Sequence, residues 1–192
     1  MSGNDHNENR YLTGRLLIAM PQMGDTRFHK AVIFICAHDA NGAMGLVINH
    51  TLPGLELSTL LSQLDIPGVT YGADVPVMSG GPVETARGFI LHAGGFNQIE
   101  SLKIEQDIYV TGTIDALKAI AQGRGPDKLM FILGYAGWSA GQLDYEMQQN
   151  AWLVTDADAD LIFSNDPDDR WERAIRKIGI DPSMLSGDAG RA

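Results

Sequence analysis

The sequence predicts an α+β fold: a single compact domain with a curled, barrel-like, mixed but mostly antiparallel β-sheet and a few flanking helices. Three observations predict it. Short apolar segments bounded by turn residues outnumber amphipathic segments. The first apolar segments follow one another closely, as in hairpins, and helical patterns fall mostly in the second half. No repeat, low-complexity tract or linker divides the chain.

The predicted strands are apolar runs that end at glycine, proline or polar residues. The first three cover 14–20, 31–37 and 43–49, and Asn41 and Gly42 indicate a slightly long hairpin loop between the second and the third. Further strands are expected at 75–78, 88–92, 108–111, 129–133, 151–155 and 161–163. Their lengths are typical of strands that pair within one sheet.

Amphipathic segments with capping residues predict the helices, which are expected at 57–64, 114–121 and 167–178. Thr113 is a suitable N-terminal cap for the second. Ser139 followed three residues later by Gln142 has the pattern of a capping box, so another helix is expected to begin there. The glycines within 134–141 predict a tight turn that connects the strand 129–133 to this helix.

The composition is that of an acidic globular protein with a formal net charge of −10. Residues 1–10 are polar and lack the apolar core of a signal peptide, so we expect a disordered tail followed by a single domain over 11–192. The negative field repels phosphate backbones, which argues against direct nucleic-acid binding, and no apolar run is long enough to cross a membrane. Cys36 is the single cysteine, which favours a reducing, cytoplasmic location.

Ser139 is a candidate nucleophile, because residues 137–141 fit the pattern G-x-S-x-G between a predicted strand and a predicted helix. The α/β-hydrolase order needs a histidine after the serine, whereas all five histidines precede it: His6, His29, His38, His50 and His92. That order is therefore excluded, and a convergent triad using His38, His50 or His92 stays open. The simpler interpretation is that Ser139 caps a helix.

Cys36 is the second candidate nucleophile. Residues i and i+2 of a strand share a face, so the Cys36 thiol could meet His38 and serve as a redox group. The simpler interpretation is a small apolar side chain buried in a core strand. The histidines lack metal-ligand spacing, so the sequence predicts no metal site, no cofactor and no complete catalytic set, and it favours a protein that is not an enzyme.

Several motifs occur in a fixed order along the chain: GRLLIAMP at 14–21, GAMGLVIN at 42–49, GGPV at 80–83, GYAGW at 134–138 and NAWL at 150–153. This series resembles the YqgE/AlgH family of bacterial proteins over nearly everything from about residue 12 onward. The resemblance implies a compact α+β fold with a curled sheet, no established reaction and no agreed catalytic residues. It also implies a regulatory role, because one branch is described as a regulator of alginate production.

We therefore expect a non-enzymatic cytoplasmic regulator, with transcription as the process that the resemblance suggests, which binds a small ligand or a protein partner. The glycine-rich turns are the expected binding site, and the pocket is expected to be lined by His38, Asn49, Gly80, Gly81, Pro82, Gly137, Trp138 and Gln142. No membrane partner is expected, and a homo-oligomer stays open. The alternative is an enzyme, either a hydrolase through Ser139 or a thiol-based redox protein through Cys36.

Overall fold

The computed structural model describes residues 11–67 and 75–185, so the expected tail over 1–10 lies outside the described residues. The strands are β1 (Arg15–Ala19), β2 (Val32–Asp39), β3 (Gly42–Val47), β4 (Thr51–Glu56), β5 (Pro76–Ser79), β6 (Val83–Ala93), β7 (Leu102–Glu105), β8 (Ile108–Thr111), β9 (Lys128–Ser139) and β10 (Trp152–Asp156). The helices are α1 (Leu57–Gln63), α2 (Ile114–Ala121), α3 (Gln142–Gln148), α4 (Ala159–Ile162) and α5 (Arg170–Lys177). Two short 3-10 helices are η1 (Thr26–Phe28) and η2 (Pro182–Leu185).

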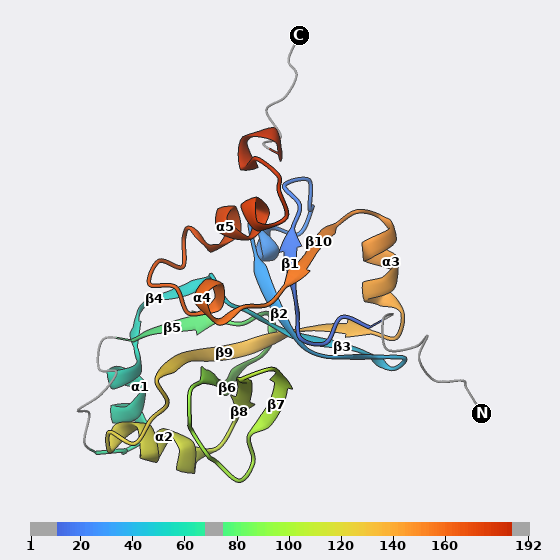
Figure 1. Ribbon diagram of the computed structural model, residues 1–192. Coiled ribbons are helices and arrows are strands. Elements are labelled where there is room, and N and C mark those ends of the chain that lie inside the picture. Colours follow the sequence, from blue (N-terminus) through green and yellow to red (C-terminus); the bar gives the residue numbers. More distant parts are fainter. Residues whose placement is uncertain (1–10, 68–74, 186–192) are drawn as a thin grey trace.

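The strands form one curled sheet around which the helices are placed (Figure 1). Its order is β10-β1-β2-β3-β9-β6-β8-β7, and β5 joins it by pairing with both β4 and β9. The β5–β9 pair is parallel, and the other strand pairs are antiparallel. The predicted α+β fold with a curled, mostly antiparallel sheet is therefore confirmed.

Strand β9 connects the two parts of the sheet. Its residues 128–133 pair with β6, and within that stretch it also pairs with β5, whereas 136–139 pair with β3. The change of neighbours occurs at Gly134, which has a φ of 75°. A Cβ atom added to Gly80 would lie 2.2 Å from the Gly134 carbonyl oxygen, so two chain segments touch here backbone to backbone. The prediction of a tight turn was therefore wrong, because these glycines permit a close crossing within a long strand.

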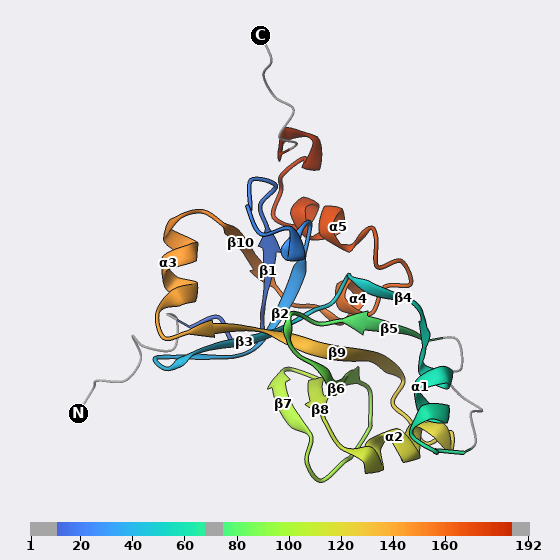
Figure 2. The same cartoon turned by 180° about the vertical axis from the view of Figure 1, so that it is seen from behind.

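The core of the described residues consists of three apolar clusters, which we name after helices that contribute to or lie over them. Figures 1 and 2 show where these helices lie around the sheet. Members of the α5 cluster include Leu16, Phe34, Cys36, Trp171 and Ile175. Members of the α1–α2 cluster include Leu57, Leu61, Leu117, Ile120 and Phe131. Members of the α3 cluster include Leu17, Ile33, Trp138, Leu143 and Trp152. Each large side chain buried in this way stabilises the fold by about 1.5–3 kcal/mol.

Some local predictions were accurate and others were not. Helix α2 has the predicted bounds, and the Thr113 hydroxyl accepts the Ala116 N–H at 3.2 Å as its cap. Leu161 and Ile162 of the expected strand 161–163 lie instead in α4, because Asp158 caps that turn by accepting the Leu161 N–H at 2.7 Å. The hairpin between β2 and β3 has a two-residue loop rather than a slightly long one. No helix among the described residues is long and apolar enough to span a membrane.

Candidate functional site

A cleft of about 410 Å³ lies between the loop that follows β1 and helix α3. Its floor is made by the end of β9 and the start of β10, through Gly137, Trp138, Ala151 and Trp152, with Pro82 beside them. One wall is the loop over residues 20–28, and the other is α3 with the two residues that follow it. The volume is within the range of small-ligand sites.

The Gln142 side chain joins helix α3 to the end of β9. Gly141 occupies the N-cap position with a φ of 73°, which favours glycine. The Gln142 side-chain oxygen accepts the Ser139 backbone N–H at 3.0 Å, which is one half of the predicted box. The Ser139 hydroxyl also donates to this oxygen, at 3.3 Å, and does not cap the helix. The predicted contact between Gln142 and the Ser139 N–H is therefore present, whereas the prediction that Ser139 caps α3 was wrong, because Gly141 is the N-cap residue.

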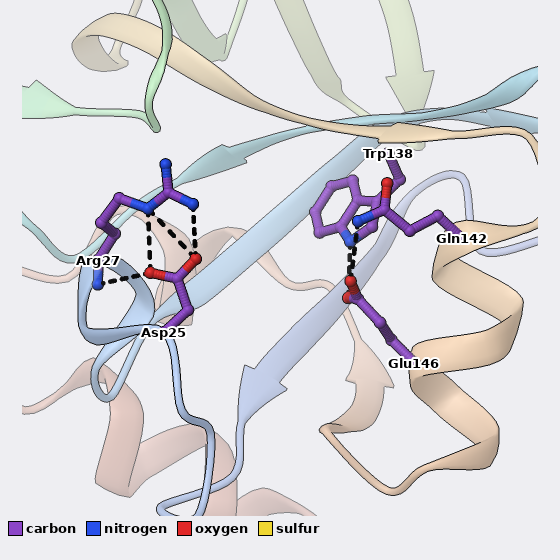
Figure 3. A network of polar contacts seen from close by, with 5 residues as sticks. All are labelled: Asp25, Arg27, Trp138, Gln142 and Glu146. Carbon is purple, nitrogen blue, oxygen red and sulfur yellow. Dashed lines mark hydrogen bonds and ion pairs between the residues drawn. The ribbon is translucent and has the colours of Figure 1, made fainter.

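The carboxylate of Glu146 fixes both tryptophans of the cleft floor. Figure 3 shows its contacts with Trp138 and Gln142. Its Oε2 atom accepts the indole N–H of Trp138 at 2.9 Å and that of Trp152 at 2.8 Å, while Oε1 accepts the Gln142 amide at 3.0 Å. The two indoles are 7% and 3% exposed, so their N–H groups need a partner inside the protein. A charged acceptor makes these hydrogen bonds strong, and the helix wall and the floor become one rigid unit.

The loop wall carries an ion pair of its own, across the cleft from Glu146 (Figure 3). The Asp25 carboxylate accepts from Arg27 Nε at 3.0 Å and from Nη2 at 2.7 Å. These hydrogen bonds lower the pKa of Asp25 below its usual value. Phe28 packs edge to face on Trp152, with ring centroids 5.8 Å apart, and thereby joins the loop to the floor.

Among the described side chains that line the cleft, the polar ones that lack internal partners are carboxamides. Of the lining residues, three carry charges, and each is already hydrogen-bonded: Asp25 to Arg27, and Glu146 to the indoles. The side chains of Gln22, Gln149 and Asn150 make no hydrogen bond within the described part of the chain. No group of three or more potential metal ligands occurs among the described residues. Among the described residues that line the cleft, each charged side chain therefore has a hydrogen-bonded partner, and the carboxamides are available for recognition.

The structure brings together half of the residues expected to line one pocket. Pro82, Gly137, Trp138 and Gln142 all line the cleft. Gly80 and Gly81 lie next to them in the chain and cross β9 at Gly134 and Tyr135, where a Cβ on Gly81 would be 2.2 Å from the Tyr135 carbonyl carbon. These two glycines support the floor without lining the cleft.

The other two expected residues lie elsewhere. His38 is buried, accepts the Leu12 N–H at Nδ1 over 3.1 Å, and places Nε2 3.8 Å from Asp144 on α3. Asn49 accepts the Val32 N–H and donates to the Lys30 carbonyl, both at 2.8 Å. Both side chains bind backbone groups, and neither lines the cleft.

Ser139 and His38 point to opposite faces of the sheet. The strand register pairs Ser139 with Gly42. His38 pairs with Ala43, which pairs with Trp138, so His38 lies in the neighbouring cross-strand row. Successive side chains of a strand alternate between faces, so Ser139 projects away from the face that carries His38. His38 is therefore not placed to act as a base for Ser139.

His50 and His92, the other two candidate bases, are also not placed to act on Ser139. His50 Nε2 lies 2.9 Å from the His29 carbonyl oxygen, which already occupies it. His92 lies in the row of Leu129, near the far end of β9, on the order of 30 Å along the strand from Ser139. The geometry thus does not favour a serine hydrolase.

Cys36 is a buried structural residue. It is 6% exposed, and burial raises the pKa of its thiol to about 12. A β-bulge between Ile35 and Ala37 inserts Cys36 as an unpaired residue, and this reverses the alternation of faces beyond it. Cys36 packs in the α5 cluster, whereas His38 pairs with Ala43, which packs against the α3 cluster. The expected meeting of the two side chains does not occur, and a redox role is not favoured.

Glu146 and the loop wall were not among the predicted site residues. A glutamate on an amphipathic helix usually faces solvent, so only its spacing of four from Gln142, after a Gly-Trp pair, could have indicated its position. The loop is irregular, and its place over the floor depends on the curl of the sheet. Sequence patterns carry no signal for that placement.

Comparison with known proteins agrees with the motifs. A family model described as AlgH-like (DUF179) matches residues 16–183. A UPF0301 protein of Bradyrhizobium diazoefficiens is 50% identical over 190 residues, which is 95% of this chain and 89% of that protein. The solution structure of the AlgH protein from Pseudomonas aeruginosa covers 100% of both chains, with a TM-score of 0.78 and 39% identity. A Corynebacterium diphtheriae protein with 18% identity and a TM-score of 0.71, over 92% of this chain and 90% of that one, has the same fold. This chain therefore belongs to the AlgH-like family.

Proposed function

We propose that this chain is a non-enzymatic regulator whose cleft between the 20–28 loop and α3 binds a neutral, polar ligand. One observation carries the proposal: the charged groups of the cleft are paired within its own walls, while three carboxamides face it without internal partners. A carboxamide offers donors and an acceptor together, which suits ligands that carry amide-like groups. A site built in this way recognises and does not catalyse.

The regulatory role and the location extend this proposal. Regulation is what the resemblance of the motifs implies, and a binding site without catalytic groups is compatible with it. Cys36 is a free, buried thiol, which suits a reducing compartment such as the cytoplasm. The net charge of −10 supports action through a ligand or a protein partner rather than by direct contact with DNA.

The proposal is tested by blocking the cleft without disturbing the fold. A Cβ at Gly24, which lines the cleft, would meet nothing within 4 Å, so Gly24→Trp adds an indole at the cleft without a clash at its Cβ. Ile99→Trp is the matched control, because Ile99 is fully exposed and lies outside the cleft lining. The probe is a mixture of neutral, amide-containing fragments, followed by NMR of the backbone amides.

We expect saturable shifts at Gly137, Gln142 and Gln149 in the wild type and in Ile99→Trp, and their loss in Gly24→Trp. Absence of shifts in all three proteins, or the same shifts in Gly24→Trp, would contradict the proposed site. Hydrolysis of small esters that is lost in Ser139→Ala would contradict the non-enzymatic part.

A further inference from the structure

The last four residues of β9 are paired on one side only. Residues 136–139 pair with β3 along one edge. On the other edge the described partner of β9 is β6, whose register with β9 ends at the pair of Val83 and Tyr135. Alternate N–H and C=O groups of 136–139 therefore point to a side where the described residues supply no strand. An open edge of this kind is a template for another strand.

This open edge lies in the cleft. Gly137 and Trp138 both line it, and Gly137 is exposed. Gly137 has no side chain to cover its neighbours, and its backbone is free of the left-handed strain seen at Gly134. The nearest residue of the crossing segment, Pro82, has no N–H with which to pair. The backbone of β9 is thus accessible from the cleft.

We propose that the occupant of the cleft is an extended, uncharged peptide segment of a partner protein, which adds as a strand to the open edge of β9 at 136–139. This inference rests on the proposed function, because it assigns the ligand class to the same site. Four strand residues span about 13 Å, and their regularly spaced donors and acceptors match another strand. The side chains of Gln149 and Asn150 on the α3 wall can bind the amide groups on the other edge of the peptide.

The charges of the cleft favour an uncharged segment. Arg27 is engaged by Asp25 through two of its nitrogens, so the loop wall attracts neither an acidic nor a basic partner. The Glu146 carboxylate is occupied by three donors. The net charge of −10 on the whole chain further disfavours an acidic peptide.

The test begins with a display library of random 12-residue peptides, selected on the full chain. Gly24→Trp serves as the decoy, and Ile99→Trp as the control that should retain binding. A selected peptide is then synthesised with single N-methyl groups at successive backbone positions. N-methylation removes one N–H and leaves the side chains unchanged, so it separates backbone pairing from side-chain contacts.

A strand directs every second backbone amide toward a given neighbour. We therefore expect N-methyl groups at every second peptide position to weaken binding by about tenfold, and N-methyl groups at the intervening positions to weaken it by less than about twofold. Amide hydrogen exchange within 136–139 should also slow when the peptide is bound. The inference would be overturned if the effect of N-methylation on peptide binding showed no two-residue periodicity and bound peptide did not slow amide hydrogen exchange within 136–139. If no peptide is enriched over the decoy while amide fragments still shift the cleft residues, the peptide assignment fails and the proposed binding function stands. If neither probe binds, both fail.

Discussion

The two halves of β9 differ although they belong to one strand. All of 128–133 pairs with β6, and residues 131–133 also pair with β5 on the other side, where Phe131 and Ile132 are 3% and 0% exposed. Residues 136–139 pair with β3 on one side, and two of them, Gly137 and Trp138, line the cleft, where Gly137 is exposed. The first half stabilises the fold, and the second half is held in place by it. A rigid strand with one open end is a suitable support for a binding site.

The largest effect should come from the first half. Ile132→Ala removes a fully buried side chain from the α5 cluster and leaves a cavity, so the free energy of unfolding should fall by about 4 kcal/mol. Urea denaturation followed by tryptophan fluorescence measures this change. A loss below about 1 kcal/mol would mean that this half of β9 is not part of the core.

The next effect tests how the floor of the second half is fixed. Glu146→Leu leaves the buried indole N–H groups of Trp138 and Trp152 without an acceptor, which should cost about 3 kcal/mol. Glu146→Gln keeps a carbonyl oxygen and should lose less than half of that. Both values come from denaturant unfolding, and equal stability of the two variants would show that these hydrogen bonds do not hold the wall.

Stability should also depend on pH, through a histidine of β6, the strand that pairs with the first half of β9. His92 is 1% exposed, and burial lowers its pKa from the ordinary 6.5 to about 4, against a weaker opposing effect of Asp107. The unfolded chain therefore takes up a proton at a higher pH than the folded chain. The contribution of the neutral His92 to the free energy of unfolding is fully present above about pH 7. It decreases as the pH falls toward 4, by about 2 kcal/mol between pH 7 and pH 5.

His92→Gln removes this titration and keeps a group that can bond the Thr111 hydroxyl, which lies 2.7 Å from His92 Nε2. The stability of this variant should vary less between pH 7 and pH 5 than that of the wild type, as measured by urea midpoints at each pH. Parallel curves for the two proteins would show that His92 does not titrate as described.

The smallest effect should come from the open half. A Cβ on Gly137 would lie 3.5 Å from Tyr135 Cε2 and 3.8 Å from Val83 Cγ2, which are ordinary contacts, so Gly137→Ala should change stability by less than about 0.5 kcal/mol. Gly134→Ala is the matched contrast, because its φ is 75° and its Cβ would lie 2.6 Å from the Gly81 carbonyl oxygen. It should cost more than about 1 kcal/mol in the same denaturation assay. Similar changes in the free energy of unfolding for both variants would show that the backbone crossing at Gly134 and the open edge at Gly137 do not differ as described.

The sequence predicted elements whose signals are local. Helix α2 followed from Thr113 and its apolar stripe, and β10 from the apolar run that contains Trp152. The continuation of β9 past Gly134 was missed, because a glycine that permits a backbone crossing has the same sequence signal as one that permits a turn. The bulge at Cys36 was missed for a similar reason, since one extra residue in a strand leaves no pattern of its own.

The candidate site was predicted in part. The glycine motifs identified Pro82, Gly137, Trp138 and Gln142, since the crossing of 80–82 over β9 brings these motifs together. The loop wall follows from the curl of the whole sheet, which no local pattern encodes.

The most direct test of the binding cleft is an NMR titration of the full chain with a selected peptide and, separately, with amide-containing fragments. We predict that shifts gather at Gly137, Gln142 and Gln149, and that Gly24→Trp abolishes them. Shifts that gather instead at the apolar pocket between α1 and α2, which is lined by Leu60 and Ile114, would contradict it.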